Sequence, residues 1–459
     1  MIRLIWKFVL AGTVLFALAQ FIHPVIPALP AKAELDAPPG VKQTLEQSCY
    51  SCHSNEVRLA WFDQIEPGYW MVRHDILTAR LHLNFSTLGS APPAVQRAKL
   101  FEAVNMIQLG AMPLRQFTAL HPGAKVTAEE LATLKAFLTP WGTPPGLSTD
   151  ANGDDERLVA HHDVRATSFL LTAVEPEPNG LAFDPSFEKW RLLSTTDRGD
   201  NNTFRFILGN DIAVKAVQSD NISPWPDGTR FAKIAWEQDL GSDGLIHPGK
   251  FVQVEVMAKD ARRYKDTDGW GWGRWRGLAL TPYGENAHFV DECTGCHMPV
   301  HDNDYVYTLP ITSARFNREQ IVNDAAASLP ASLPWEPLGW RALTMYVDPK
   351  TRTTATLYGN DTAVQSLERT DAAATRPPGY PSGTLLALVT WAQRDDPRWF
   401  GGRIPDTPLK VEFVQASSGN GANIYRVFEG KTLAETHPDT QNSAQRTGFI
   451  LNLKPVSLP

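Results

Sequence analysis

The sequence predicts a multidomain protein: a small all-α domain followed by two α+β domains built mainly on antiparallel sheets. Three observations predict it. At 459 residues the chain has room for about two to four domains. Apolar residues have helical spacing up to residue 141, and beyond residue 160 they form short segments typical of strands. Finally, motifs of this strand-rich part recur in the same order about 150 residues later.

The first 33 residues predict export. Arg3 and Lys7 precede an apolar run over residues 8–22, and Ala31-Lys32-Ala33 offers a small-residue cleavage site. The run of about 15 residues is long enough to leave an uncleaved anchor in the inner membrane open beside cleavage, although roughly 20 residues are needed to span a bilayer comfortably. We expect the rest of the chain to be periplasmic. Its net charge of −7 gives no basic surface for nucleic acid.

All four cysteines lie in two copies of one pattern, Cys49-Tyr50-Ser51-Cys52-His53 and Cys293-Thr294-Gly295-Cys296-His297. Two such pairs could instead form short-range disulfides or share one zinc ion. A histidine directly after the second cysteine in both copies favours c-type haem attachment, in which both thiols bond to the porphyrin and the imidazole ligates iron. We therefore expect two covalently bound haems, with His53 and His297 as proximal ligands.

The region 34–142 is predicted to be the helical haem domain. Helices are expected at 41–49, 94–109 and 127–138, the last opened by a capping box that Thr127 and Glu130 form. If the first haem only carries electrons, its iron needs a second ligand. Met112, in a Met-Pro loop, is the first choice because a thioether raises the reduction potential. His74 and His121 remain alternatives.

Four motifs of this region resemble the haem-binding domain family that has a single C-x-x-C-H. They are Ser48-Cys49 to Ser54-Asn55, Val72-Arg73-His74-Asp75, Leu83-Asn84-Phe85-Ser86 and Gly110-Ala111-Met112-Pro113. The resemblance covers about 100 residues. Residues 143–162, rich in turn formers and then acidic, are predicted to be a linker.

The next predicted domain, 163–315, is strand-rich. Strands are expected at 203–208, 230–236, 251–257 and 277–280, and a short helix at 258–264. Trp270, Trp272 and Trp275 form the densest aromatic cluster of the chain. We expect them to pack against the haem edge or against the following domain.

A final domain at 333–459 is predicted from an internal repeat. Trp190-Arg191 and Gly209-Asn210-Asp211 recur 150 residues later, and Gly228-Thr229 and Trp236 recur 155 residues later. The same alignment places Arg205 against Ala355, Lys233 against Leu388, and Val254-Glu255-Val256 against Val411-Glu412-Phe413. No C-x-x-C-H follows in the second copy. We expect that copy to lack haem and to act as a packing partner, a cover or a docking surface.

The first copy resembles cytochrome P-460, a family of periplasmic c-haem proteins in which a lysine is cross-linked to the porphyrin. The resemblance rests on 227–233, on 251–255 continuing to Lys259-Asp260, and on 292–297. It implies that Lys233 is the cross-linking lysine and that His297 is the proximal ligand. It further implies that Glu255 and Arg205 are the carboxylate and the arginine of the distal pocket.

The resemblance implies hydroxylamine oxidation or nitric oxide processing at a haem whose second iron face is open. Physical chemistry supports these residue types, because a desolvated lysine has a lowered pKa, a carboxylate can accept protons, and an arginine can steady anionic nitrogen oxides. Electrons would leave through the N-terminal haem to a soluble redox protein. Alternatives are a non-enzymatic binder of nitric oxide or carbon monoxide and a pure electron-transfer cytochrome, and homodimerisation stays open. In the plainest interpretation Lys233 is a surface lysine, and Glu255 and Arg205 form a surface ion pair.

Overall fold

The computed structural model describes residues 2–139, 174–312, 325–368, 380–417 and 422–456. Contacts between residues divide the chain into two compact units, Met1–Trp141 and Gly142–Pro459. The predicted linker at 143–162 lies outside the described residues. Within the described ranges, no helix combines the length and the apolar character needed to cross a membrane.

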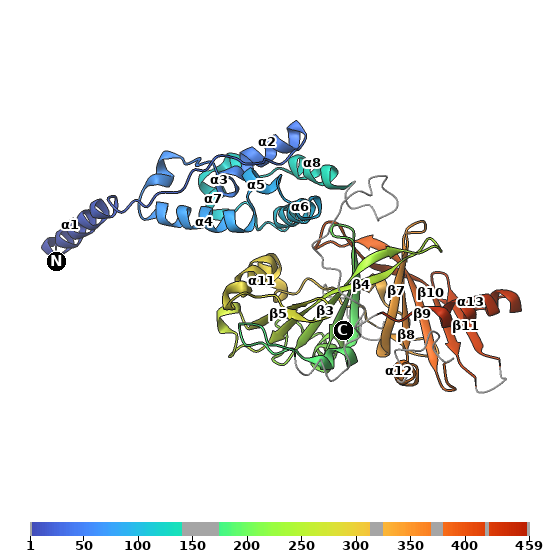
Figure 1. The fold of residues 1–459 in the computed structure, drawn as a ribbon. Coiled ribbons are helices and arrows are strands. Elements are labelled where there is room, and N and C mark those ends of the chain that lie inside the picture. The colour runs from blue at the N-terminus through green and yellow to red at the C-terminus, as the bar shows by residue number, and fades with distance from the viewer. Residues whose placement is uncertain (1, 140–173, 313–324, 369–379, 418–421, 457–459) are drawn as a thin grey trace. The chain divides into compact units, whose positions relative to one another are not determined.

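The first unit is helical (Figure 1). Its α-helices are α1 (Ile2–Ala19), α2 (Pro39–Ser48), α3 (Tyr50–His53), α4 (Gly68–His82), α5 (Phe85–Leu88), α6 (Pro93–Gln108), α7 (Arg115–Leu120) and α8 (Ala128–Leu138). The three predicted helices are confirmed as α2, α6 and α8. The capping box is also confirmed, since the Thr127 hydroxyl accepts from the Glu130 backbone N–H and the Glu130 carboxylate accepts from that of Thr127. Helix α8 packs against α2 and α6.

The second unit is built on antiparallel strands (Figure 1). Its first half contains β1 (Arg191–Arg198), β2 (Thr203–Gly209), α10 (Asp211–Ser219), β3 (Arg230–Leu240), β4 (Ile246–Lys259), β5 (Trp270–Arg276), β6 (Thr281–Pro282) and α11 (Val290–His297). Its second half contains β7 (Arg341–Asp348), β8 (Thr353–Gly359), α12 (Asp361–Glu368), β9 (Leu385–Asp395), β10 (Gly402–Gln415), β11 (Ile424–Glu429), β12 (Ala434–Thr436) and α13 (Thr440–Asn452). Helices followed by antiparallel sheets confirm the predicted fold class.

The two halves repeat one strand pattern. In both, a register shift interrupts the first strand pair at the same place, between Leu192 and Ser194 and between Ala342 and Thr344. In both, an asparagine caps the following helix: Asn210 accepts from the Ala213 backbone N–H, and Asn360 accepts from that of Ala363. The structure therefore reproduces the displacement by 150 residues that the sequence motifs show.

Each half pairs with the other at both ends. Strand β4 pairs with β7 at Ile246 and Val347, and β10 pairs with β1 at Arg403 and Asp197. The strands β1, β2, β3, β4, β7, β8, β9 and β10 consequently follow one another in a closed ring. Closure leaves none of these eight strands as a free sheet edge.

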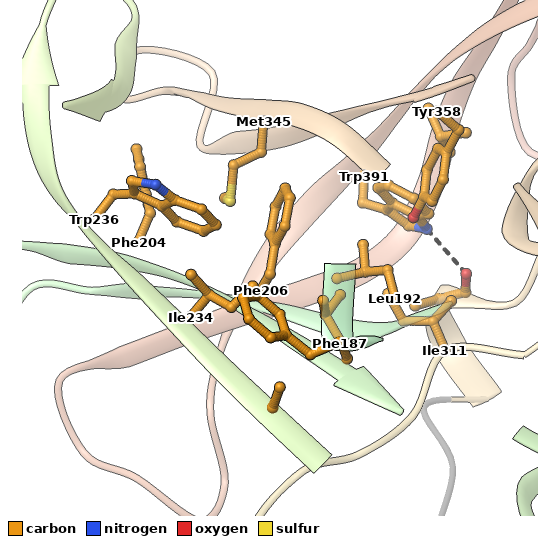
Figure 2. Packing of buried hydrophobic residues seen from close by; sticks show 14 of the residues in the cluster. Phe187, Leu192, Phe204, Phe206, Ile234, Trp236, Ile311, Met345, Tyr358 and Trp391 are labelled. Carbon is orange, nitrogen blue, oxygen red and sulfur yellow. Dashed lines mark hydrogen bonds between the residues drawn. The ribbon is translucent and has the colours of Figure 1, made fainter. Parts of the chain in front are cut away.

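The halves also share one hydrophobic core (Figure 2). Phe204, Phe206 and Trp236 from the first half and Met345 and Trp391 from the second are all buried in it. Because apolar area removed from water stabilises a fold in proportion to its extent, neither half would keep this stabilisation alone.

Two predicted elements are wrong. Residues 277–280 form a turn, and the strand lies just before them as β5. Residues 258–264 are not helical, because β4 runs on to Lys259 and a turn follows in which the Asp260 carboxylate accepts from the backbone N–H groups of Arg262 and Arg263. This side-chain bonding is typical of an aspartate turn.

Candidate haem sites

The first candidate site lies where α2 ends and α3 begins. Cys49 follows the last residue of α2, and Cys52 and His53 lie in α3. Burial raises the pKa of Cys49 to about 12 and that of Cys52 to about 11, so both thiols stay protonated. Within the described ranges, no three His, Cys, Asp or Glu side chains gather into a group that could hold a metal ion.

His53 is oriented by a backbone carbonyl. Its Nδ1 lies 3.0 Å from the Leu83 oxygen and donates to it, which leaves Nε2 as the nitrogen for iron. Burial also lowers the pKa of His53 and so favours its neutral, ligating form. The ring of Phe85 lies edge-on, 6.5 Å from the imidazole.

The three candidates for the second ligand of the first haem differ in their surroundings. His121 has both ring nitrogens engaged, Nδ1 at 3.1 Å from the Phe117 oxygen and Nε2 at 3.0 Å from Asp63 Oδ2. His74 is exposed on α4. Met112 follows α6, and its side chain is 36% exposed. The contacts of His121 disfavour it, and Met112 stays the predicted ligand.

The second candidate site is on α11, which packs against β5. His297 Nδ1 lies 2.7 Å from the Tyr305 carbonyl oxygen, and the rings of Trp272 and Tyr307 lie 4.7 and 5.1 Å from the imidazole. Burial lowers the pKa of His297 to about 4, so the imidazole is neutral at neutral pH. Nε2 is again left for iron. Burial raises the pKa of Cys293 to about 12.

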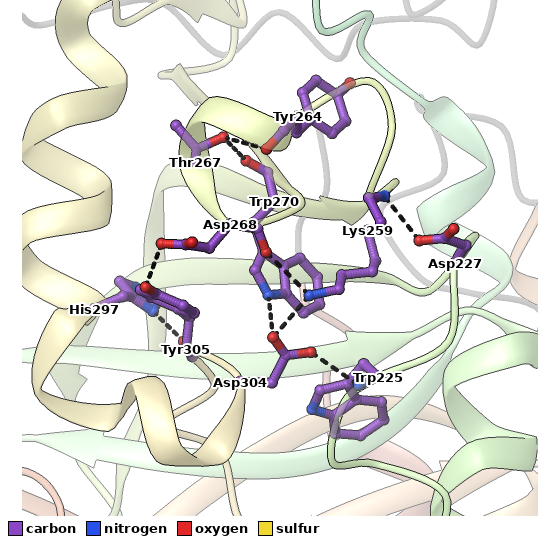
Figure 3. Close-up of polar contacts among 11 residues, drawn as sticks. Trp225, Asp227, Lys259, Tyr264, Thr267, Asp268, Trp270, His297, Asp304 and Tyr305 are labelled. Carbon is purple, nitrogen blue, oxygen red and sulfur yellow. Dashed lines mark hydrogen bonds and ion pairs between the residues drawn. The ribbon is translucent and has the colours of Figure 1, made fainter.

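The backbone that bonds to His297 is held in an unusual conformation. Asp304 and Tyr305 have φ values of 48° and 65°, in the left-handed region that bulky residues rarely adopt. The Asp304 carboxylate accepts from Lys259 Nζ at 2.7 Å and from Trp270 Nε1 at 3.2 Å (Figure 3). The Tyr305 hydroxyl donates to Asp268. This network fixes the carbonyl that orients the histidine, and its members Lys259, Asp268, Asp304 and Tyr305 were not predicted as site residues.

Lys233 and Glu255 lie next to each other in the part of the sheet formed by β3 and β4. They are directly opposite on β3 and β4, and Glu255 is in turn opposite Arg274 on β5. Cross-strand partners point to the same face, so the three side chains form one row. Lys233 and Glu255 form an ion pair, and Arg274 Nε lies 3.6 Å from Glu255. Arg274 was not predicted, since its strand was not recognised.

Burial and charge set the ionisation of this row. Burial lowers the pKa of Lys233 to about 8 despite the attraction of Glu255. Burial alone would raise the pKa of Glu255, but Lys233, Arg274 and Arg205 outweigh it and hold the pKa well below its usual range. Lys233 and Glu255 are 28% and 18% exposed, so neither is an ordinary surface residue.

Arg205 lies on β2 opposite Ala235, two residues further along β3 than Lys233. Ala235 is in turn opposite Gln253, and Gln253 donates to Glu255. Burial and the charge of Arg198 lower the pKa of Arg205 to about 10, so it remains a cation. Arg205 Nε is buried and has no hydrogen-bond partner in the described structure, and the same is true of Trp272 Nε1. Buried donors without acceptors fit a site built to hold another group, as haem binding requires.

Comparison with known families places both sites in haem-binding regions. Residues 185–308 match the family model of cytochrome P460, and residues 11–140 match that of a haem-binding domain. Residues 185–308 are therefore similar to the cytochrome P460 family. No curated protein matches the chain. The cytochrome P460 match spans the Lys233 row and His297, and the other match spans His53 and Met112. The chain is therefore a haem cytochrome with a cytochrome P460 domain behind a haem-binding domain.

In the second copy, the sheet face that corresponds to the Lys233 row carries different side chains. The register of this copy places Leu388 opposite Glu412 and Glu412 opposite Val427, where the P460 domain has Lys233, Glu255 and Arg274. Ala355 likewise stands where the P460 domain has Arg205. The predicted alignment of these positions is confirmed by the register, and three of four charged positions have become aliphatic.

Helix α13 fills the space above this face. Its Ile450 packs in one buried cluster with Leu388 and Ala355. Its Arg446 forms a bidentate pair with Glu412, both bonds being 2.7 Å, and the Glu412 side chain is fully buried. In the P460 domain the helix that follows the same strands is α11, which carries His297. An apolar core therefore occupies the position in the second copy that corresponds to the haem side of the first.

Proposed function

We propose that the chain is an exported dihaem c-type cytochrome that oxidises hydroxylamine, or processes nitric oxide, at the haem held by Cys293, Cys296 and His297. The haem would supply a redox-active iron that accepts electrons from the substrate. Electrons would then leave through the haem held by Cys49, Cys52 and His53 to a soluble redox protein. The row of Lys233, Glu255 and Arg274 beside His297 is the observation that carries this proposal.

Lys233 has the properties required of a cross-linking residue. It is half-buried, and its pKa of about 8 makes the neutral, nucleophilic amine accessible near neutral pH. A bond from Nζ to a porphyrin carbon would replace one N–H and one C–H bond. Both protons would be released, and the electron pair would pass to an oxidant such as dioxygen.

Cross-linking would change the charge beside Glu255. An ammonium group that holds the pKa of Glu255 down would be converted to a neutral secondary amine, while Arg274 and Arg205 remain. The pKa of Glu255 would rise from its depressed value, so the carboxylate would become a better base. The cross-link would thus prepare Glu255 to accept protons from hydroxylamine as it is oxidised.

Arg205 would bind the anionic part of the substrate or product. It remains a cation although its Nε is buried, and this Nε has no hydrogen-bond partner in the described structure. A desolvated guanidinium with an available donor suits small nitrogen oxides that carry negative charge.

The N-terminus supports export to the periplasm. Helix α1 exposes its apolar side chains, with Phe8 71% and Leu15 67% exposed, and Lys7 lies among them. A helix of this kind suits a signal segment that a membrane or the export machinery covers. Cleavage by signal peptidase is tested by the mass of the mature protein.

Rapid mixing with hydroxylamine tests the proposed function. We expect the second haem to be reduced first and the first haem to follow. Reduction of neither haem would contradict the proposal. Binding of added nitric oxide or carbon monoxide by a chain that hydroxylamine does not reduce would favour the non-enzymatic binder. Mass spectrometry of a protease digest tests the cross-link separately. A peptide containing Lys233 should remain joined to the peptide that contains Cys293 and Cys296.

A further inference from the structure

The loop between β9 and β10 of the second copy reaches the haem-ligand segment of the P460 domain. Arg398, in this loop, donates through one Nη to the carbonyls of Val306 and Tyr307, at 3.1 Å each. The neighbouring Trp399 lies edge-on to Tyr307, with ring centroids 5.6 Å apart. Val306 directly follows Tyr305, whose carbonyl accepts from His297 Nδ1.

Trp399 is itself firmly held by the first copy. Its Nε1 donates to Asp200 at 3.3 Å, and the guanidinium of Arg198 lies over its ring at 4.3 Å. Arg198 and Asp200 form a buried ion pair at the end of β1. The loop is therefore anchored by an aromatic ring between a cation and a carboxylate, next to the pairing of β1 with β10.

A corresponding contact lies at the other junction between the two copies, where β4 pairs with β7. The β3–β4 connection of the first copy reaches the second, where Leu245 packs against the apolar cluster of α13. Ile246 pairs with Val347 there. Each copy thus sends the same hairpin toward the helix that covers its partner's sheet. Leu245 of the first copy's hairpin packs against a hydrophobic core, whereas Arg398 and Trp399 of the second copy's hairpin contact the segment that supports His297.

We infer that the second copy completes the proximal side of the P460 haem, and that Arg398 and Trp399 are positioning residues for His297. Tyr305 is in the left-handed region, so the direction of its carbonyl depends on contacts around it. Asp304 holds the chain on one side, and Arg398 fixes the two carbonyls on the other. The carbonyl in turn makes the imidazole a stronger donor to iron. This role would explain why a copy without haem is kept.

The inference depends on haem ligation by His297 and not on the proposed oxidation of hydroxylamine. A chain that only binds nitric oxide would require the same support. A result against the positioning role of Arg398 and Trp399 is therefore distinguishable from a result against hydroxylamine oxidation.

The test compares full-length holoproteins in which Cys49 and Cys52 are both serine, so that all haem signals come from the second site. We expect Arg398→Gln to lower the iron–histidine stretching frequency in resonance Raman spectra of the ferrous form and to raise the reduction potential. Both shifts follow from a weaker bond between His297 and the Tyr305 carbonyl. Trp399→Phe, which loses the bond to Asp200, should shift both in the same direction by less.

Arg352→Gln is the matched control, because Arg352 is in the same copy, is 62% exposed and pairs only loosely with Asp395 at 3.8 Å. It should leave both values unchanged. Arg398→Lys keeps a positive charge and an N–H donor group on a differently shaped side chain, so it should give intermediate shifts. It decides the test if Arg398→Gln attaches no haem. Wild-type frequency and potential in Arg398→Lys and Trp399→Phe would overturn the inference.

Discussion

Lys233 and Glu255 face each other across β3 and β4 and form an ion pair in the sheet that packs against α11, the helix that carries His297. A lysine opposite a carboxylate is a common surface pair and contributes little there. Here both side chains are largely removed from water, so the pKa of Lys233 falls to about 8 while Glu255 stays ionised. The pair therefore holds a reactive amine and a base side by side.

Replacing Lys233 by methionine tests its bond to the porphyrin. Methionine has similar length but no amine, so the haem should attach through its cysteines and show an ordinary c-type Soret band. The wild type should show a red-shifted, broadened band. Optical spectra of both redox states provide the measurement. Lys215→Met, on the exposed surface of α10, is the control and should keep the shifted band. A shifted band in Lys233→Met would show that another residue modifies the haem.

The rate of cross-linking should depend on pH through Lys233. Because its pKa in the folded chain is about 8 and thus below the ordinary 10.5, the reactive neutral amine becomes populated as pH rises through about 8. The cross-link should form faster at about pH 9 than at about pH 7 and level off above that. The growth of the shifted Soret band after adding oxidant gives the rate. A rate independent of pH over this interval would mean that loss of the Lys233 proton does not limit the reaction.

The burial that lowers the pKa of Lys233 also lowers the free energy of unfolding, whereas an ion pair that raises a lysine pKa would increase it. A lysine whose folded pKa is lowered opposes folding while it is charged, and this cost declines as pH rises from about 8 toward the ordinary pKa. Lys233→Met removes the cost. Relative to the wild-type chain before cross-linking, it should therefore raise the free energy of unfolding more at neutral pH than at high pH, as urea titrations at both pH values would show.

Sequence patterns predicted the elements whose signals are local. The C-x-x-C-H motifs, the capping box at Thr127 and the repeat are read directly from residue spacing. Strand β5 was missed because Gly271 and Gly273 weaken its strand pattern. The structure explains them, since a Cβ on Gly271 would lie 2.3 Å from the Tyr264 ring and one on Gly273 would lie 2.7 Å from the Trp275 ring. Glycine is required there for the close approach of aromatic rings.

Contacts between distant segments could not be predicted from one sequence. Arg274 joins Glu255 only because β5 pairs with β4, and Arg398 reaches Tyr307 only because the two copies close into one ring. No local pattern distinguishes either arginine from the others. The aromatic cluster was predicted to pack against the haem edge or against the following domain. Trp275 lies in the core shared with the second copy, which confirms the second alternative for this residue, and Trp272 lies 4.7 Å from the His297 ring.

Replacing Asp304 by asparagine tests the network behind His297. Lys259 is 8% exposed, so loss of its carboxylate partner leaves a buried ammonium that contacts the Asp268 backbone oxygen at 3.2 Å and the Trp270 ring. We expect Asp304→Asn to lower the free energy of unfolding by about 3 kcal/mol, measured by denaturant titration. Adding Lys259→Met should recover part of the loss. Equal stability of Asp304→Asn and the wild type would show that the ion pair does not hold this segment.

Replacing Met112 by leucine tests the second ligand of the first haem. Leucine conserves volume but has no sulfur, so the reduction potential of this haem should fall and its low-spin spectrum should be lost. His74→Gln is the control and should change neither. Loss of the low-spin spectrum in His74→Gln instead would assign the ligand to His74. Potentiometric titration followed by optical spectra measures both properties in each variant.

Glu255 and Glu412 occupy the same register position in the two copies, so the same substitution at both separates chemistry from structure. Glu255→Gln should slow hydroxylamine oxidation by about 10²-fold or more, because the proton acceptor is lost. Its cost in stability should be about 1 kcal/mol or less, since Lys233 can release its proton once its partner is neutral.

Glu412→Gln should lower stability strongly and leave the oxidation rate unchanged, the reverse of Glu255→Gln. Arg446 cannot lose its proton, and Glu412 also accepts from the Tyr425 hydroxyl at 2.7 Å. We expect a loss of about 2–4 kcal/mol in the free energy of unfolding, with the haem spectrum and the oxidation rate unchanged. Urea titration and rapid mixing on both variants measure the two effects. If Glu255→Gln lost only stability, Glu255 would have the same structural role as Glu412, and the proton acceptor would have to be another residue.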